Sequence, residues 1–169
     1  MTAFIRKLRG DGVALPAKPG MKAIMLAWLG GFCAIALVAG MAAKLEMMLV
    51  LGSFGASCVL LFGFPDAPFS QPRNTIAGHF LSSLVGLTCL MLFGPTWWSV
   101  ALAVATAIAL MMATRTVHPP AGSNPVIVYL IQPEWDFLLF PTLTGALLVA
   151  LVALIYNNMT RKDRYPKYW

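Results

Sequence analysis

Charged side chains are scarce in this sequence, and acidic ones are the scarcest. Of the 169 residues, 11% are Asp, Glu, Lys or Arg and six are acidic, whereas soluble domains carry about 25% charged residues. So few charges could not cover a globular surface, and 59% of the chain is hydrophobic. Because a surface in lipid needs no charge, the shortage excludes an ordinary soluble domain. It predicts an all-α, polytopic transmembrane helical bundle.

Groups that carry metal or acid–base chemistry are also few. The two histidines, His79 and His118, lie far apart in the sequence. The three cysteines are an odd number without C-x-x-C spacing, so we interpret them as small buried apolar residues. The carboxylates between the terminal regions lie in loops or at the edges of apolar segments, at Glu46, Asp66, Glu134 and Asp136. A membrane-embedded enzyme would need clustered ligands or acid–base pairs, so we expect no catalysis, no metal and no other cofactor.

The basic residues gather near the two ends of the chain. They precede the first apolar segment at Arg6, Lys7, Arg9, Lys18 and Lys22, and follow the last at Arg161, Lys162, Arg164 and Lys167. Nucleic-acid binding would need a soluble basic face interleaved with aromatics, whereas clusters beside apolar spans follow the positive-inside rule. We therefore expect an integral protein of a bacterial inner membrane, with both termini cytoplasmic and no nucleic-acid partner. Because the start is polar, we also expect no cleavable signal peptide.

Breaks rich in glycine, proline and charge divide the chain into six apolar segments. A basic N-terminal arm (1–22) and a basic tail (158–169) flank a transmembrane domain (23–157). Several segments approach the ~20 residues that a spanning helix needs, and others are shorter or interrupted by small residues. We predict the six segments at 23–43, 47–64, 76–93, 100–113, 126–131 and 137–156.

The two halves of this domain, about 23–93 and 94–157, resemble each other at an offset of 67 residues. The offset places Gly55 on Gly122 and Gly78 on Gly145. Membrane segments share a composition, so such similarity also arises without duplication. Three crossings in each half would make a 3+3 inverted repeat, as in many transporters. Four spans with two re-entrant segments fit the sequence as well.

Three motifs in a fixed order resemble the HPP family of integral membrane proteins. They are Gly52-Ser53-Phe54-Gly55-Ala56-Ser57 with Val59-Leu60-Leu61-Phe62-Gly63, Gln71-Pro72-Arg73-Asn74 with Gly78-His79, and Thr114-Arg115-Thr116-Val117-His118-Pro119-Pro120-Ala121-Gly122. The family is named for the tripeptide at His118. The resemblance covers residues 22–157 and implies a transporter, since plant plastid and cyanobacterial members are linked to nitrite transport.

The segment that begins at His118 is also suited, by its residues alone, to start a half-helix. Pro119 and Pro120 lack backbone donors and fit the first turn of a helix, with Gly122 close behind. The free N–H groups and positive dipole end would face whatever lies in front. At the matching break in the first half, Gly52 and Gly55 would allow close backbone approach. Two such helix starts pointing at each other would make a weakly positive site for a small anion.

The predicted solute path combines these breaks with nearby polar and basic residues: Ser53, Ser57, Arg73, Arg115, His118, Ser123 and Asn124. The arginines would concentrate an anion at the inner mouth, the serines and Asn124 would replace part of its hydration shell, and His118 would supply a proton. Structural alternatives exist for each. Small residues allow close helix packing, arginines anchor a chain at lipid headgroups, and His118 or Asn124 can cap a helix. We predict that His79 is structural and bonds to the loop at 71–74.

We therefore expect a transporter or channel for a small solute, with a monovalent anion such as nitrite as the candidate that the resemblance implies. A structural or regulatory subunit of a membrane complex is the alternative. Six short segments leave little room for an enclosed path, so we expect a homo-oligomer, with the glycine-rich first span as one candidate interface.

Overall fold

The computed structural model describes residues 16–45 and 52–169, and within these ranges every regular element is helical. Most of the predicted arm and residues 46–51 lie outside the described residues. The helices are α2 (Met21–Leu45), α3 (Gly52–Cys58), α4 (Pro72–Phe93), α5 (Trp97–Ala113), α6 (Asn124–Ile131) and α7 (Thr144–Thr160). Wider π-helical turns form η1 (Val59–Gly63) and η5 (Leu139–Leu143), and tighter 3-10 turns form η2 (Pro68–Ser70), η3 (Pro119–Ser123) and η4 (Trp135–Leu138). The predicted all-α fold is confirmed.

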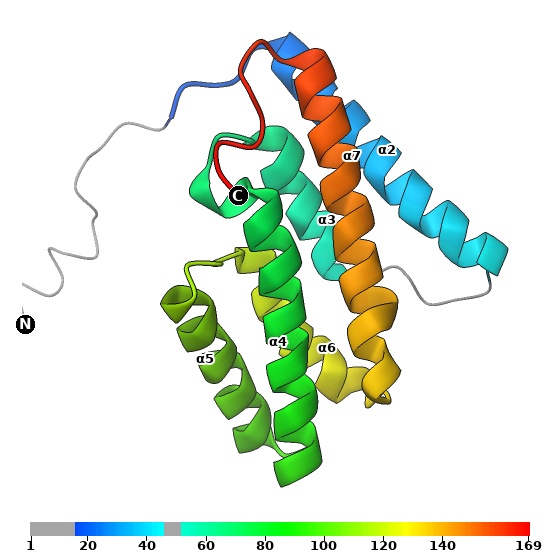
Figure 1. The fold of residues 1–169 in the computed structure, drawn as a ribbon, viewed down its shortest axis with the longest axis vertical. Helices are drawn as coiled ribbons and strands as arrows, with labels where there is room; N and C mark the ends of the chain where they lie inside the picture. Colours follow the sequence, from blue (N-terminus) through cyan, green and yellow to red (C-terminus); the bar gives the residue numbers. More distant parts are fainter. Residues whose placement is uncertain (1–15, 46–51) are drawn as a thin grey trace, which may run out of the picture.

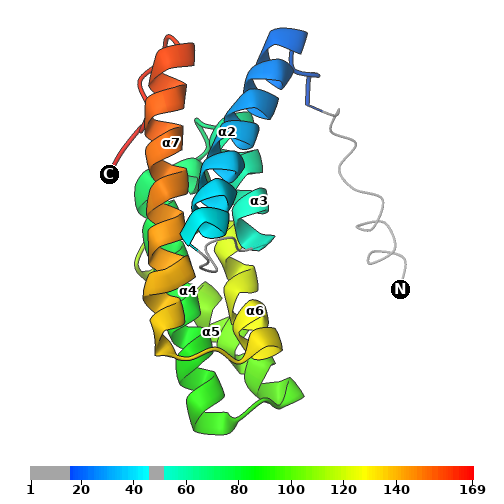
Figure 2. The same cartoon turned by 90° about the vertical axis from the view of Figure 1, so that its right-hand side faces the viewer.

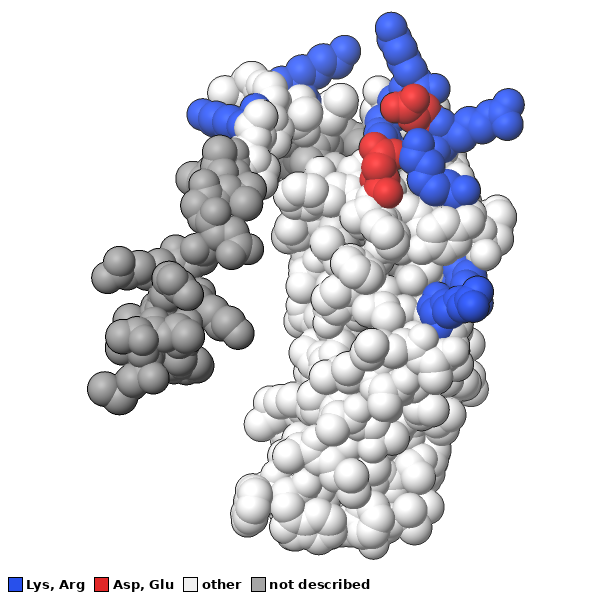
Figure 3. Space-filling model, turned by 90° about the vertical axis from the view of Figure 1, so that its left-hand side faces the viewer, with Lys and Arg blue, Asp and Glu red and all other residues white. Residues whose placement is uncertain are grey.

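The long helices run roughly along the long axis of the molecule, two in each direction (Figure 1). α2 begins and α7 ends at the same end of the molecule, which we call the basic end. Figure 3 shows basic side chains gathered there. The basic residues beside these helix termini are Lys18, Lys22, Arg161, Lys162, Arg164 and Lys167. α4 runs away from the basic end, while α5 and α7 run back toward it.

α3 and α6 are short and begin near the middle of the molecule (Figure 2). α3 with η1 runs toward the basic end, whereas η3 with α6 runs toward the opposite end, and the starts of α3 and η3 pack together. Three described segments are long and apolar enough to span a membrane: Met21–Lys44, Pro72–Phe93 and Trp135–Thr160. α5 has 17 residues, or about 25 Å, against a hydrocarbon core of about 30 Å. The mixture of long and short segments predicted from the sequence is therefore present.

The element boundaries follow the 67-residue offset. The offset places Gly52–Gly63 on 119–130, and η3 with α6 covers 119–131. It places α4 on 139–160, which are the bounds of η5 with α7. The members of each pair run in opposite directions (Figure 1), as an inverted repeat requires. Duplication itself stays a prediction.

α5, α6 and α7 all pack against α4, and small residues allow close approach to it. The chain turns from α4 into α5 at Gly94, whose φ of 69° favours glycine. Residues four apart then form the buried stripe of α5, at Ser99, Ala103, Ala107 and Met111. On α4, a Cβ added to Gly86 would lie 2.9 Å from Pro125 Cα of α6. Close approach of this kind supplies the van der Waals packing that holds helices together in lipid.

The prediction that Gly52 and Gly55 allow close backbone approach is wrong for the part of the chain that the structure describes. A Cβ added to either residue would meet no atom within 4 Å, and the same holds for Gly122. Among the described glycines, the close approaches occur instead at Gly78 and Gly86 on α4 and at Gly30 on α2. Gly52 and Gly55 therefore have no packing role among these residues.

Candidate functional site

The connection between α5 and η3 carries His118 into the interior. Arg115 has a left-handed φ of 56° and ends α5, and the Thr116 N–H then donates to Met111 O at 2.9 Å. His118 is extended, and Pro119 starts the next helical turn as predicted. Gly78 on α4 leaves room for the ring, since a Cβ there would lie 2.8 Å from His118 Cβ. His118 is consequently fully buried.

A serine of α3 bridges the two histidines of the chain. Ser57 Oγ lies 2.9 Å from His79 Nε2 and 2.8 Å from His118 Nε2. All three side chains are fully buried, and the centroids of the two rings are 5.1 Å apart. Side chains from α3, α4 and the start of η3 therefore meet at one hydroxyl.

Asn124, at the start of α6, extends this network beyond His79. Its Nδ2 lies 3.1 Å from His79 Nδ1 and 2.9 Å from Ser83 Oγ. Ser83 Oγ in turn lies 3.1 Å from Thr142 Oγ1 of η5. All these side chains are buried. We call the following five residues the central polar cluster: Ser57, His79, Ser83, His118 and Asn124.

The donors and acceptors of the cluster fix its direction when both imidazoles are neutral. Phe69 O can only accept and lies 2.7 Å from His118 Nδ1, so Nδ1 carries the proton and Nε2 accepts from Ser57. Ser57 then accepts from His79 Nε2–H, and His79 Nδ1 accepts from the Asn124 amide. Hydrogen bonds thus run in one direction from Asn124 to Phe69.

Ser57 also has a second acceptor within reach. The carbonyl oxygen of Ser53 lies 3.1 Å from Ser57 Oγ. If the hydroxyl turns toward Ser53 O, its oxygen can accept from both histidines, so His118 Nε2 can carry a proton as well. The cluster can therefore gain one proton while every member keeps a hydrogen-bond partner.

The cluster holds no carboxylate. The described Asp and Glu residues lie outside the cluster, in loops, in η4 and in the tail, at Asp66, Glu134, Asp136 and Asp163. Across residues 16–45 and 52–169, no three His, Cys, Asp or Glu side chains come together in a way that could hold a metal ion. The site is thus a neutral assembly of hydroxyl, imidazole and amide groups.

Arg73 and Arg115 lie side by side but do not join the cluster. The Arg73 guanidinium donates to Arg115 O and Thr114 O, both at 3.3 Å, and so satisfies carbonyls at the end of α5. Arg115 is exposed. In the described structure no hydrogen bond links either arginine to the cluster. That the two arginines attract an anion stays a prediction.

The two remaining serines of the predicted path face different ways. Ser123 is exposed and donates to Pro120 O at 2.8 Å, so it points away from the cluster. Ser53 is 3% exposed, and its hydroxyl has no hydrogen-bond partner among the described residues. Because Ser53 precedes Ser57 by four residues on the same helix, both side chains lie on one face.

The prediction that His79 bonds to the loop at 71–74 is wrong. Both ring nitrogens of His79 are used by Ser57 and Asn124. The sequence analysis also missed Ser83. The available signal was a run of polar side chains within a span-length segment, since polar groups inside a membrane usually face the protein interior and mark functional positions.

Comparison with known proteins agrees with this architecture. Residues 16–166 match the transmembrane region of the HPP family. Two transmembrane proteins of Dictyostelium discoideum are 39% and 35% identical to the chain over 98% of its length. The chain spans 63% and 57% of the length of these curated relatives. No solved structure matches it. The family match covers the whole central polar cluster, and the protein is an integral membrane protein of the HPP family.

Proposed function

We propose that the protein transports a small monovalent anion across the membrane, with nitrite as the specific candidate. The central polar cluster would be the solute site. The supporting observation is the Ser57 hydroxyl of α3, which joins two buried imidazoles beside the start of η3. Transporters commonly place their sites where discontinuous helices start near the midplane.

The local charge favours an anion over a cation. α6 and its preceding turn begin beside His118 and Asn124, and helix starts present free N–H groups and positive dipole ends. The cluster offers no carboxylate as a partner for a cation. The Ser53 hydroxyl would add a further donor on the same face. Arg73 and Arg115 would raise the anion concentration nearby.

A proton carried with the anion would avoid moving a net charge through the membrane interior, where charge is costly. His118 Nε2 would accept this proton while Ser57 turns its hydroxyl toward Ser53 O. The resulting imidazolium would pair with the anion. When both leave, Ser57 would again donate to His118, which restores the neutral network.

Nitrite uptake into proteoliposomes under an inward proton gradient tests this proposal. We expect saturable uptake above that of empty liposomes, which also correct for passive entry of nitrous acid. Ser57→Ala and His118→Gln should abolish it. Tyr156→Phe is the matched control, because it removes a hydroxyl that donates to Leu26 O and not to the cluster, and it should keep native uptake. All variants are first compared for monodispersity and thermal unfolding.

Two results would each contradict a different part of the proposal, the solute or the site. Uptake equal to that of empty liposomes, with either a proton gradient or a membrane potential, would remove nitrite as the solute. Saturable uptake that Ser57→Ala and His118→Gln leave unchanged would remove the cluster as the site.

We also propose that the chain forms a homo-oligomer through α2. Of the membrane-length segment in α2, 17% is buried, against 44% for α4. A groove of about 620 Å³ between α2 and α3 is lined in part by Trp28, Gly31 and Gly55, and small residues favour helix association in lipid. The same face would suit a subunit of a larger complex, which is the alternative function. A chain that stays monomeric in detergent and moves no solute alone would favour that role.

A further inference from the structure

The loop between η1 and α4 is held from two sides. Its three successive carbonyl groups, at Pro68, Phe69 and Ser70, each accept one side-chain hydrogen bond. The donors are, in order, the Tyr168 hydroxyl at 2.7 Å, His118 Nδ1 at 2.7 Å and the Tyr165 hydroxyl at 2.6 Å. The loop therefore connects the C-terminal tail (residues 161–169) to a member of the central polar cluster.

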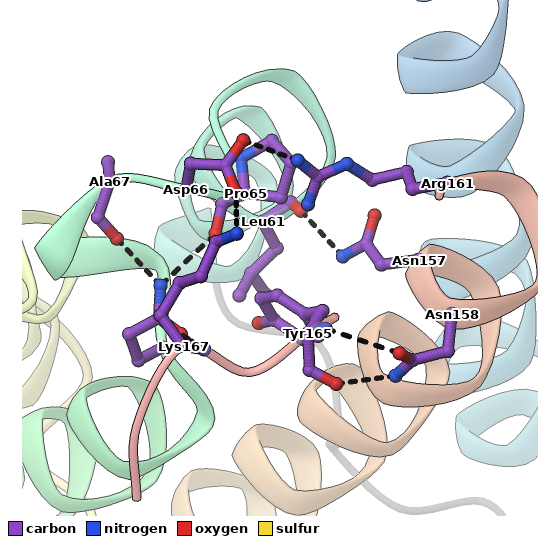
Figure 4. Close-up of polar contacts among 10 residues, drawn as sticks. Leu61, Pro65, Asp66, Ala67, Asn157, Asn158, Arg161, Tyr165 and Lys167 are labelled. Atoms are coloured by element: carbon purple, nitrogen blue, oxygen red, sulfur yellow. Dashed lines mark hydrogen bonds and ion pairs between the residues drawn. The ribbon is translucent and has the colours of Figure 1, made fainter. Parts of the chain in front are cut away.

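Side chains add to the attachment between the loop and the tail (Figure 4). Asp66 in the loop pairs with Arg161 and with Lys167, whose Nζ lies 3.0 Å from the carboxylate. The Lys167 N–H donates to Gln71 Oε1 at 2.7 Å, and Gln71 Nε2 donates back to loop carbonyls. The tail thus contacts the loop through both charged and neutral groups.

Tyr165 is the anchor of the tail. Its side chain is 3% exposed, and Asn158 at the end of α7 bonds to both its N–H and its C=O (Figure 4). Burial raises the pKa of the Tyr165 phenol above its ordinary value of 10.0. The hydroxyl consequently remains a donor to Ser70 O at physiological pH.

Two buried polar atoms beside the loop have no hydrogen-bond partner among the described residues. They are Ser70 Oγ and Asn74 Oδ1. Asn74 Nδ2 donates to Val117 O at 2.9 Å, next to His118 in the chain. Unpaired buried polar atoms are rare and call for water or a ligand. Both residues are close to His118, since Ser70 follows Phe69, whose carbonyl accepts from His118, and Asn74 bonds to Val117.

We propose that the tail is a latch that holds the 65–71 loop closed over the central polar cluster, and that its release opens the solute path at the basic end. This inference rests on the proposed function, since it assigns a gate to the same site. The tail contains no helix, and Tyr165 is its one buried residue, so its release requires that this side chain leave the core while the helices stay packed. Such a segment can open without unpacking the helices.

In this arrangement Tyr165 and Tyr168 are positioning residues. Neither touches the cluster, but each holds a carbonyl next to Phe69. They therefore keep Phe69 O in place to accept from His118 Nδ1, which sets the direction of the hydrogen-bond chain. Release of the tail frees Phe69 and ends that constraint.

Access to Ser53→Cys from the basic end tests the latch. The variant is made in a background without Cys33, Cys58 and Cys89, reconstituted in vesicles, and treated with a membrane-impermeant thiol reagent on that side. Tyr165→Phe and Asp66→Asn should each raise the labelling rate roughly two- to tenfold, as expected for loss of one to two polar contacts. Tyr156→Phe is the matched control, because its hydroxyl donates to Leu26 O on α2 and not to the loop.

Amide hydrogen exchange of residues 65–71 provides a second measurement that needs no cysteine. Exchange should be faster in Tyr165→Phe and unchanged in Tyr156→Phe. Native labelling and native exchange in both Tyr165→Phe and Asp66→Asn would overturn the latch. Neither measurement depends on a transported solute. Faster labelling without any anion uptake would therefore support the latch while removing the anion from the proposed function.

Discussion

His79 and His118 are expected to be opposite neutral tautomers. Phe69 O can only accept, so His118 carries its proton on Nδ1, and the shared Ser57 hydroxyl then requires His79 to carry its proton on Nε2. Nitrogen-15 solid-state NMR of the protein in bilayers at neutral pH should resolve one Nδ1–H and one Nε2–H ring.

Ser57→Ala serves as the control for this assignment. It removes the bridge but leaves Phe69, so His118 should keep its Nδ1 proton while both Nε2 resonances shift. Two rings with the same tautomer in the native protein would contradict the directed network.

Members of the site that stand beside a local sequence signal could be predicted, whereas those that depend on contacts between distant segments could not. His118 and Asn124 stand where η3 and α6 start, and Ser57 follows a glycine-rich break within one helical turn or two, so glycine and proline mark all three locally. Ser83 is one of many residues on a long apolar helix, and which face of that helix is enclosed depends on α3, α6 and η5. The partners of Arg73 are backbone carbonyls 41 and 42 residues away, which no local pattern encodes.

At the level of elements, the contact of α4 with α6 depends on Gly86. A Cβ there would lie 2.9 Å from Pro125 Cα, and a backbone atom cannot swing aside as the end of a side chain can. Gly86→Ala is therefore expected to destabilise the fold by about 1–3 kcal/mol, the usual cost of overpacking. Thermal unfolding in detergent measures this loss of stability relative to the native protein.

Gly55→Ala is the matched substitution on another helix, because the added methyl group would meet no described atom within 4 Å. Its effect should stay within about 0.5 kcal/mol. Equal losses in the two variants would show that α4 and α6 do not pack as closely as Gly86 indicates.

The loop–tail contact is expected to weaken only in acid. Burial pushes the pKa of Asp66 up, but hydrogen bonds from Lys167 and Arg161 and the charges of both outweigh burial and lower the pKa below its ordinary 3.8. A carboxyl group with a lowered pKa stabilises the folded state fully above its ordinary value, and this contribution disappears as the pH falls through the lowered one. Exchange of the loop amides, corrected for its intrinsic pH dependence, should thus rise below pH 3.8 in the native protein. Asp66→Asn should show no such added rise.

Helix boundaries were predictable where a local signal marks them. The segment predicted at 23–43 is helical over Met21–Leu45, and Pro119 correctly predicts the start that leads into α6. The last span was predicted at 137–156, but α7 begins at Thr144. The backbone at Phe140, just before Pro141, is extended (φ −132°, ψ 115°). Pro141 was therefore the signal for this later start, because the residue before a proline favours an extended backbone.

At the scale of the whole molecule, the 67-residue offset correctly pairs helices of the two halves that run in opposite directions. It does not predict that α4 takes the central position. All the long segments are apolar, so composition cannot rank them by burial. Their order around α4 depends on matching surfaces between segments that lie far apart in the chain, such as Gly86 with Pro125. The meeting of α3 with η3, by contrast, was anticipated from the two sequence breaks, and these elements do pack together.

The charges of the molecule predict its orientation in the membrane. The basic end carries the lysines and arginines beside α2 and α7, so by the positive-inside rule we expect it to face the cytoplasm, with Glu134 and Asp136 on the other side. In a bacterial inner membrane, an impermeant maleimide should label Asp136→Cys in intact cells and Lys162→Cys only after permeabilisation. Both positions are exposed, and both variants lack the native cysteines. The reverse labelling would put the latch outside, and the gate and the proton path to His118 would then open to the periplasm.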